Sequence, residues 1–118
     1  MKILIVDDNE HMRNEIVVLV SRPGDDLRSC GDGATAIGEY EAMRPDWVLM
    51  DVRMPGMDGL AATREILARD PGAKIAVVTN YAEDQELRNA ANAAGAKLFL
   101  GKDRLDELRD ALDAFDRG

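Results

Sequence analysis

The chain has 118 residues, of which 46% are hydrophobic, and a single cysteine. This length suits one domain, which would bury roughly two-thirds of its unfolded surface, so we expect one domain over residues 1–118. Asp and Glu outnumber Lys and Arg by 23 to 15, for a net charge of −8. Such a surface repels phosphates, which argues against direct contact with DNA or RNA. The lone Cys30 allows no internal disulfide and no thiolate metal site, in keeping with a reducing cytoplasm.

The N-terminus carries no recognisable export signal. Four apolar residues follow Lys2 before two acids interrupt the run. No stretch approaches the roughly 18 apolar residues that would span a bilayer. The sequence therefore predicts a cytoplasmic protein without membrane contact.

Hydrophobic patterning alternates between strand-like and helix-like along the chain. Strands are predicted, in chain order, at Lys2–Val6, Leu27–Cys30, Trp47–Met50, Lys74–Thr79 and Lys97–Leu100. Helices are predicted between and after them, at His11–Ser21, Ala34–Met43, Leu60–Arg69, Glu83–Ala94 and Leu105–Asp116. Apolar strands that alternate strictly with helices indicate an α/β fold, with a parallel sheet and helices on both faces.

Three of these helices carry features that can be checked against the structure. The first helix should bury one face, formed by Met12, Ile16, Leu19 and Val20. The alanine-rich fourth helix should end at Gly95, a natural C-cap. The last helix should bury a stripe opposite its acids and arginines, formed by Leu105, Leu108, Ala111, Leu112 and Phe115.

Chemically active side chains gather where the predicted strands end. In an open α/β sheet, ligands bind beyond the carboxyl ends of the strands. The residues just past such ends are Asp7, Asp8, Asp51, Thr79 and Lys102. Taken alone, the Asp7-Asp8 pair followed by Asn9 would favour a helix cap. The matching position of Asp51 makes three converging carboxylates the better interpretation, and these suit Mg²⁺ or Mn²⁺ rather than zinc.

The same set of residues suits phosphoryl transfer to a carboxylate. Thr79 alone would be an ordinary buried strand residue, and Lys102 alone an ordinary solvated lysine. Beside the acids, the ammonium of Lys102 would offset repulsion and bind a phosphoryl oxygen. Asp51 would then be the nucleophile, while the metal, lysine and hydroxyl neutralise charge on the equatorial oxygens.

Four motifs give the chain a close resemblance to a known family. They are Ile5-Val6-Asp7-Asp8-Asn9, the block from Asp51 through Met54-Pro55-Gly56-Met57-Asp58-Gly59, Val77-Val78-Thr79, and Ala94-Gly95-Ala96 leading to Lys102. Over nearly its whole length the chain resembles the receiver domain of bacterial two-component response regulators. That resemblance implies a flavodoxin-like, doubly wound (βα)₅ fold, with a five-stranded parallel sheet of order 2-1-3-4-5.

The resemblance also implies residue roles. Asp51 would be the phosphoacceptor, taking its phosphoryl group from a sensor histidine kinase. Mg²⁺ would be bound by the carboxylates of Asp8 and Asp51, by the backbone carbonyl of Arg53, and through water by Asp7. Lys102 would bridge to Asp51 or to its phosphoryl group.

The implied output is a conformational switch. Thr79 would move toward the phosphoryl group and Phe99 would be its aromatic partner, changing the surface of the fourth helix, fifth strand and fifth helix. This change would control a downstream output such as transcription, with homodimerisation on phosphorylation. Beyond self-phosphorylation and self-dephosphorylation, no enzymatic activity is expected.

Two positions depart from the common family pattern. Asp103 follows Lys102 where many members have proline, so we expect a trans peptide bond there. A Lys-Asp pair resembles the receivers of LuxR/NarL-type regulators. Phe99 occupies a position where tyrosine is frequent, and phenylalanine has no hydroxyl to donate a hydrogen bond.

Other classes compete with this interpretation. A flavin-binding flavodoxin should have a phosphate-cradling loop of Ser, Thr and Gly after its first strand, where this chain has Asp7-Asp8. A haloacid-dehalogenase-like phosphatase should have an acid two residues after the nucleophile, where this chain has Arg53. A phosphorylation-independent pseudo-receiver, acting only as an interaction module, would not require the complete set of site residues found here.

Overall fold

The computed structural model describes all 118 residues and contains one five-stranded sheet. The strands are β1 Lys2–Val6, β2 Asp26–Cys30, β3 Trp47–Met50, β4 Ile75–Thr79 and β5 Leu98–Gly101. The α-helices are α1 Glu10–Val20, α2 Gly33–Met43, α3 Gly59–Arg69, α4 Gln85–Ala94 and α5 Leu108–Arg117, and a 3₁₀ helix, η1 Lys102–Glu107, precedes α5. Every predicted strand agrees with the observed one to within a residue at each end.

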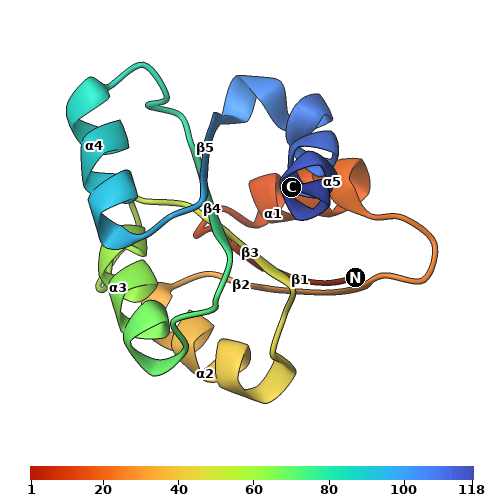
Figure 1. Ribbon diagram of the computed structural model, residues 1–118, viewed down its shortest axis with the longest axis horizontal. Helices are drawn as coiled ribbons and strands as arrows, with labels where there is room; N and C mark the ends of the chain where they lie inside the picture. Colours follow the sequence, from red (N-terminus) through yellow and green to blue (C-terminus); the bar gives the residue numbers. More distant parts are fainter.

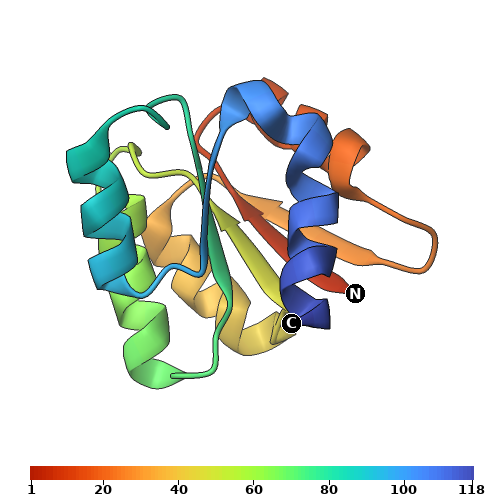
Figure 2. The same ribbon diagram turned by 45° about the horizontal axis from the view of Figure 1, so that its top comes forward.

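All neighbouring strands are parallel, in the order β2-β1-β3-β4-β5, which confirms the predicted topology. Helices α1 and α5 cover one face of the sheet, and α2, α3 and α4 cover the other (Figure 1). Both termini lie toward the amino ends of the strands (Figure 2). The carboxyl ends of β1 and β3, where the acidic motifs begin, therefore share the opposite end of the molecule.

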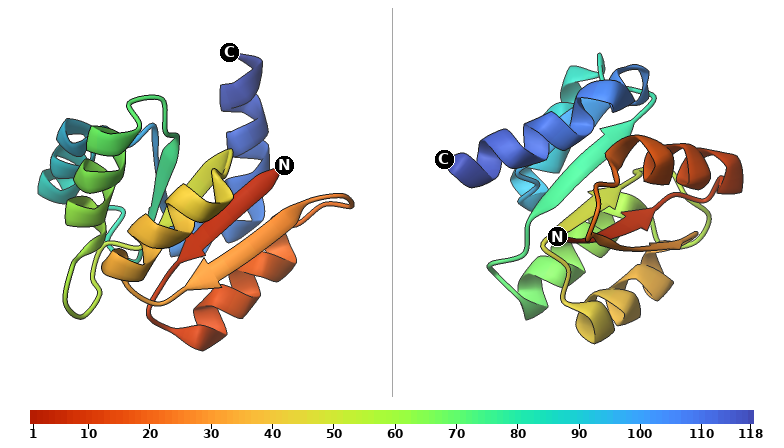
Figure 3. Two further views of the ribbon diagram at one scale, coloured as in Figure 1. Left: turned by 90° about the horizontal axis from the view of Figure 1, so that it is seen from below. Right: turned by 90° about the vertical axis from the view of Figure 1, so that its right-hand side faces the viewer.

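Successive side chains along a strand point to opposite faces of the sheet. The buried, mostly apolar runs of β1, β3 and β4 therefore make both faces apolar at the centre of the sheet, whereas the edge strand β2 is polar and largely exposed. On β1, Ile3 and Ile5 pack toward α1 and α5, whereas Leu4 and Val6 pack toward α2 and α3. All four are at most 1% exposed. The centre of the sheet is thus buried between the two layers of helices, which Figure 3 shows from two further sides.

Local capping fixes where the helices begin and end. Four of them start after an Asn or Asp whose side chain accepts the backbone N–H three residues later, at Asn9, Asp32, Asp58 and Asp84. The cap at Asp84 explains why α4 begins at Gln85 and not at the predicted Glu83. Gly95 ends α4 in the left-handed conformation, with φ 102°, as predicted.

The predicted last helix, over residues 105–116, needs correction, because this segment is divided between η1 and α5. Within η1, Arg104 has φ −123° and ψ 33°, which interrupts helical geometry. The Lys102–Asp103 bond that opens η1 is trans, as predicted, since the chain contains no cis peptide bond.

The apolar face predicted for the first helix also needs correction at one position. Ile16 and Val20 are buried, with Met12 and Val17 packed beside them. Leu19 is 39% exposed, because the stripe that faces the sheet passes along the other side of α1.

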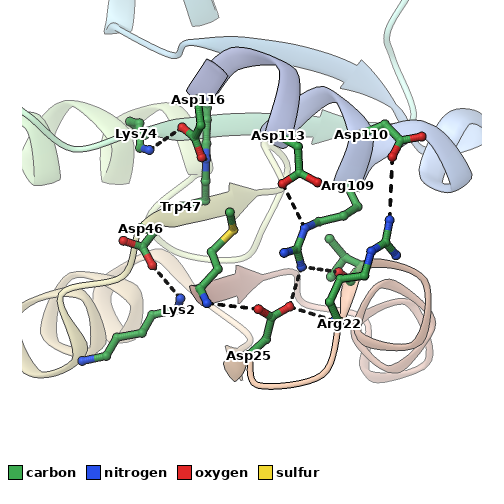
Figure 4. A network of polar contacts seen from close by, with 12 residues as sticks. Lys2, Arg22, Asp25, Asp46, Trp47, Lys74, Arg109, Asp110, Asp113 and Asp116 are labelled. Atoms are coloured by element: carbon green, nitrogen blue, oxygen red, sulfur yellow. Dashed lines mark hydrogen bonds and ion pairs between the residues drawn. The ribbon is translucent and has the colours of Figure 1, made fainter. Parts of the chain in front are cut away.

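Helix α5 is fastened to the amino end of the sheet by polar contacts (Figure 4). Arg109 forms an ion pair with Asp25 and donates to the carbonyl oxygen of Val20 at 3.0 Å. Near the C-terminus of α5, Asp116 accepts a hydrogen bond from the indole N–H of Trp47 at 3.1 Å and forms an ion pair with Lys74.

None of the helices combines the length and the apolar character that a membrane span requires.

Candidate acidic site at the carboxyl end of the sheet

Asp7 and Asp51 directly follow β1 and β3, and backbone hydrogen bonds place them there. The N–H of Asp51 donates to the carbonyl of Val6 at 2.8 Å, and that of Asp7 to the carbonyl of Cys30 at 3.1 Å. Each bond continues the pattern of the sheet one residue past its strand. Asp7 is 1% exposed and Asp51 7%, so the strand ends deliver both carboxylates to a nearly buried position.

The loop after β3 requires a glycine where it returns to the sheet. The N–H of Gly59, the first residue of α3, donates to the carbonyl of Val52 at 2.7 Å. A side-chain carbon at Gly59 would overlap the backbone carbonyl of Asp51. The glycine of the Met-Asp-Gly segment thus lets α3 start directly against the acidic residue.

The three predicted carboxylates do converge. Ligand oxygens of Asp7, Asp8 and Asp51 all lie within 4.8 Å of one another, with Asp8 exposed and the other two buried. Like charges at this separation repel strongly, and oxygen donors of this kind suit a hard divalent cation. The acids do not cap α1, because Asn9 has that role.

Lys102 supplies a cation to this cluster. Its side chain is 8% exposed, and its Nζ lies 2.7 Å from Oδ2 of Asp7 and 3.4 Å from Oδ1 of Asp51. The sequence predicted a bridge to Asp51, and the structure adds a shorter one to Asp7. Burial acts to lower the pKa of Lys102, but the two acids outweigh it and the pKa is raised.

The environment of Asp51 disfavours its charged form. Burial, reinforced by the charge of Asp7, raises the pKa of Asp51 to about 6. Lys102 and the N–H of Val52, which donates to Oδ1 of Asp51 at 2.9 Å, act in the opposite direction. At neutral pH Asp51 is thus largely ionised, but it is a carboxylate that gains much from further positive charge.

The donor atoms fit a hard cation such as Mg²⁺. Oδ2 of Asp7 is buried, and it forms the salt bridge to the ammonium of Lys102 at 2.7 Å. Its other oxygen accepts the N–H of Asn9 at 2.9 Å. One lysine against three converging carboxylates leaves an excess of negative charge, which a bound divalent cation would offset.

Thr79 lies at the predicted end of β4, but it does not line the cleft that contains the acids. It is 1% exposed, and its Oγ1 accepts the N–H of Tyr81 at 3.0 Å, which closes the turn after β4. Phe99 on β5 is half-buried beside α4, with the guanidinium of Arg88 4.6 Å from the centre of its ring. Neither residue lines the acidic cleft.

The cleft above Asp51 contains residues that sequence reasoning did not identify. It is lined by Asp7, Asp8, Asn9, Asp51, Arg53, Asn80, Tyr81 and Lys102. Asn80 and Tyr81 were missed, although both follow β4 at the same end of the sheet as the acids, and that position was an available signal. Arg13 was also missed; from α1 it donates to the carbonyl oxygen of Asp7 at 2.7 Å and supports the loop after β1.

Comparison with known proteins identifies the family of this chain. The sequence profile of the response regulator receiver domain matches residues 3–113. The chain belongs to this family, and so to the receiver domains of two-component signalling.

Curated relatives agree with this assignment. The chemotaxis protein CheY of Halobacterium salinarum is 32% identical over 96% of this chain and 98% of its own length. The response regulator VraR of Staphylococcus aureus is 33% identical over the whole of this chain, which spans only 57% of VraR. The chain therefore matches both a relative of its own size and the receiver portion of a longer one.

Solved structures agree as well. A LuxR-family two-component response regulator from Aurantimonas has a TM-score of 0.89 at 32% identity, over 97% of this chain and 83% of that protein. CheY in the CheX–CheY–BeF₃–Mg²⁺ complex of Borrelia burgdorferi has a TM-score of 0.85 at 27% identity, over 98% and 89% of the two chains. The predicted resemblance to LuxR/NarL-type receivers agrees with the similarity to this LuxR-family regulator.

Proposed function

We propose that the chain accepts a phosphoryl group on Asp51 from a sensor histidine kinase, with Mg²⁺ bound beside it. The observation that supports this most directly is the arrangement of charged side chains on the floor of the cleft. There a nearly buried Asp51 lies 3.4 Å from the ammonium of Lys102 and within reach of two further carboxylates. Phosphoryl transfer to a carboxylate requires this combination of a nucleophile and neighbouring groups that offset charge.

In the proposed reaction, a carboxylate oxygen of Asp51 attacks the phosphorus of a phosphorylated histidine. The new P–O bond forms as the P–N bond breaks, and the electron pair of that bond stays on the imidazole nitrogen. Asp51 must be ionised to attack, which its pKa of about 6 allows at neutral pH. Lys102 is placed to bind an oxygen of the transferred group once this has displaced part of its contact with Asp7.

Four residues would hold the metal. Asp8 and Asp51 would bind it through carboxylates, Arg53 through its backbone carbonyl and Asp7 through water. When bound, Mg²⁺ neutralises negative charge on the acids and on the phosphoryl oxygens. The excess of three carboxylates over one lysine in this cluster supports a bound cation.

The proposal includes an output switch. Thr79 would exchange its hydrogen bond with Tyr81 for one to the phosphoryl group, and Phe99 would reorient beside α4. Helix α4 is suited to shift, because the only residues that it buries are two small ones, Ala91 and Ala94. A ligand shifts a conformational equilibrium only through contacts that differ between the states. Thr79 would make such a contact.

The altered surface of α4, β5 and α5 would control a downstream output. Similarity to a LuxR-family response regulator and to VraR supports regulation of transcription in a longer protein, with dimerisation on phosphorylation. The acidic receiver, with its net charge of −8, would leave DNA contact to another part of that protein. Catalysis by the domain would be limited to its own phosphorylation and dephosphorylation.

Incubation with acetyl phosphate and Mg²⁺ tests the proposal. Intact mass should show one added phosphoryl group, and Asp51→Asn should remove it. Asp58→Asn is a matched control, because Asp58 is an exposed carboxylate of the same loop whose capping of α3 asparagine can replace. Labelling of Asp51→Asn to the same extent as wild type would refute the assignment.

A further inference from the structure

Arg88 of α4 contacts both the aromatic ring of Phe99 and the loop after β4. Its guanidinium carbon lies 4.6 Å from the centre of the Phe99 ring, on the edge strand β5. The same guanidinium donates a hydrogen bond at 3.3 Å to the backbone carbonyl oxygen of Ala82, in the loop between β4 and α4. One exposed side chain therefore joins α4, β5 and the loop that follows Thr79.

The guanidinium makes these contacts although an acid is available one turn earlier on the helix. Asp84 lies four residues before Arg88, a spacing that suits an ion pair. Its carboxylate instead accepts the backbone N–H of Leu87 and caps α4. Phe99 has no hydroxyl with which to fix its own position by a hydrogen bond. The ring thus depends on its apolar neighbours and on the guanidinium of Arg88.

A cavity lies between the Phe99 ring and the acidic site. Its volume is about 450 Å³, and its lining includes Phe99, Ala82 and Gly101. Asn80 and Lys102 line both this cavity and the acidic cleft, so the two spaces adjoin. The ring therefore has room to turn toward the site, and such a turn would carry it away from the guanidinium.

We propose that Arg88 stabilises the resting arrangement of Phe99 and of the loop after β4, and so opposes the switch. The inference rests on the proposed function, in which Thr79 moves toward the phosphoryl group and Phe99 reorients. A guanidinium over an aromatic face forms a cation–π contact. A contact that is made in one state and broken in the other biases the equilibrium between them. Arg88 is thus a positioning residue, since it does not line the cleft that contains Asp51.

Removal of Arg88 should have the opposite effect to simple loss of a positive charge. An arginine attracts anions, so its loss would weaken the binding of a phosphoryl-like anion if charge alone decided the affinity. Loss of a contact that stabilises the resting state should instead strengthen this binding, because a larger fraction of the protein then has the competent conformation. The direction of the change in affinity therefore separates the two explanations.

The test is a titration of Mg²⁺-saturated protein with beryllofluoride, which mimics the phosphoryl group, followed through the backbone amides of α4 and β5 by NMR. Arg88→Met removes the charge and the donor but keeps an unbranched side chain that suits a helix. The variant should bind beryllofluoride roughly 2- to 5-fold more tightly than wild type. Before beryllofluoride is added, its amide signals should already be displaced toward those of the bound wild type.

Two further variants test whether the contact with the ring is the cause. Lys97 is exposed and lines the groove between α4 and β5 together with Arg88. Lys97→Met removes a charge from the same face and should bind beryllofluoride no more tightly than wild type. Phe99→Leu keeps an apolar side chain but removes the aromatic face. In that background Arg88→Met should change the affinity by less than about 2-fold, because the guanidinium has already lost its partner.

The outcomes are distinguishable. Wild type that binds no beryllofluoride in the presence of Mg²⁺ would refute the proposed function, and this inference with it. If wild type binds it but Arg88→Met binds it equally or more weakly, only the role of Arg88 is refuted. Equal tightening by Lys97→Met, or by Arg88→Met in the Phe99→Leu background, would also refute that role, since the contact between guanidinium and ring would then not be the cause.

Discussion

The two ends of the sheet differ in the hydrogen-bond donors and charges that surround a buried aspartate side chain. At the amino end, Asp25 accepts hydrogen bonds from Arg109, from the backbone N–H of Arg22 and from the amine of Met1. At the carboxyl end, Asp51 has the N–H of Val52 and a 3.4 Å contact with Lys102, a lysine that it shares with Asp7. One acid is surrounded by donors, and the other belongs to a cluster with more acids than cations.

The pKa values follow this difference and not burial. The side chain of Asp25 is 4% exposed and that of Asp51 9%, so burial alone would raise both pKa values. Hydrogen bonds from Arg109, Arg22 and Met1 nevertheless lower the pKa of Asp25 to about 2, whereas that of Asp51 is raised to about 6. The hydrogen bonds at the amino end stabilise the charge of Asp25. The carboxyl end has an excess of negative charge, which a bound cation would offset.

The largest effect should come from breaking the amino end. Arg109→Ala leaves Asp25 buried without its main partner, and we expect a loss of roughly 3 kcal/mol in the free energy of unfolding. Arg22→Ala is the matched control, because its guanidinium meets Asp110 at 3.7 Å with both side chains substantially exposed. That change should cost less than about 0.5 kcal/mol.

Urea denaturation monitored by circular dichroism measures both variants. The backbone N–H of Arg22 that donates to Asp25 survives the substitution, so the control tests the side chain alone. Equal losses for Arg109→Ala and Arg22→Ala would contradict the view that burial of the ion pair decides its importance.

At the carboxyl end, removal of a charged side chain should raise the free energy of unfolding and not lower it. Asp51→Asn removes a charge that Asp7 repels, so metal-free protein should be stabilised at pH 7 by about 1–2 kcal/mol. The gain should shrink at pH 5, where wild-type Asp51 is already largely protonated. Addition of Mg²⁺ should raise the melting temperature of wild type and do less for Asp51→Asn. A variant less stable than wild type at pH 7 would contradict this account.

Asp51 and Asp25 should affect the free energy of unfolding in different ranges of pH. Asp51 has a folded pKa of about 6, above its ordinary value of 3.8, so its cost is complete above pH 6 and is relieved as the pH falls from 6 to 3.8. Asp25 has a folded pKa of about 2, below 3.8, so its contribution is complete above the ordinary value and is lost as the pH falls toward 2.

Metal-free stability, measured by urea titration from pH 7 to pH 2.5, should separate these contributions. The difference between wild type and Asp51→Asn should shrink first, between about pH 6 and pH 4. The difference between wild type and Asp25→Asn should persist to about pH 4 and shrink below it. The reverse order would show that the assignment of the two shifts is wrong.

The carboxyl end was more readable from sequence than the amino end. Asp7 and Asp51 could be placed together because each follows an apolar strand, and parallel strands end at the same edge. Arg109 could not be distinguished from Arg22, since both look like polar-face arginines. Only the packing of α5 against α1 makes one of them nearly buried.

Contacts between loops were equally inaccessible. Tyr81 follows β4 at a position that the pattern does locate, but its contact with Arg53 depends on how two loops fold over the strand ends. Thr79 was placed correctly at the end of β4, yet the hydrogen bond that turns it toward Tyr81 is a property of the turn. The predicted roles of Thr79 and Phe99 in switching therefore stay predictions.

The smallest expected effect is that of Mg²⁺ on the fluorescence of Trp47. The fold places this residue at the amino end of the sheet, so its emission should report on that end alone. Its ring is fully buried, meets Phe115 edge-on with centroids 5.3 Å apart, and donates its indole N–H to Asp116. It begins β3 four residues before Asp51, roughly 13 Å away along an extended strand. Addition of Mg²⁺ should therefore leave the tryptophan fluorescence nearly unchanged.

Asp116→Ala is the positive control, because it should change the fluorescence that Mg²⁺ leaves unchanged. It removes the acceptor of the indole N–H and the partner of Lys74, so the emission of Trp47 should shift and the free energy of unfolding should fall by about 1 kcal/mol. A large quench on Mg²⁺ addition to wild type would show that the ends of the sheet are coupled through β3. Their separation into a stabilising end and a ligand-binding end would then fail, because a cation at Asp51 would be felt at the contacts that hold α5 in place.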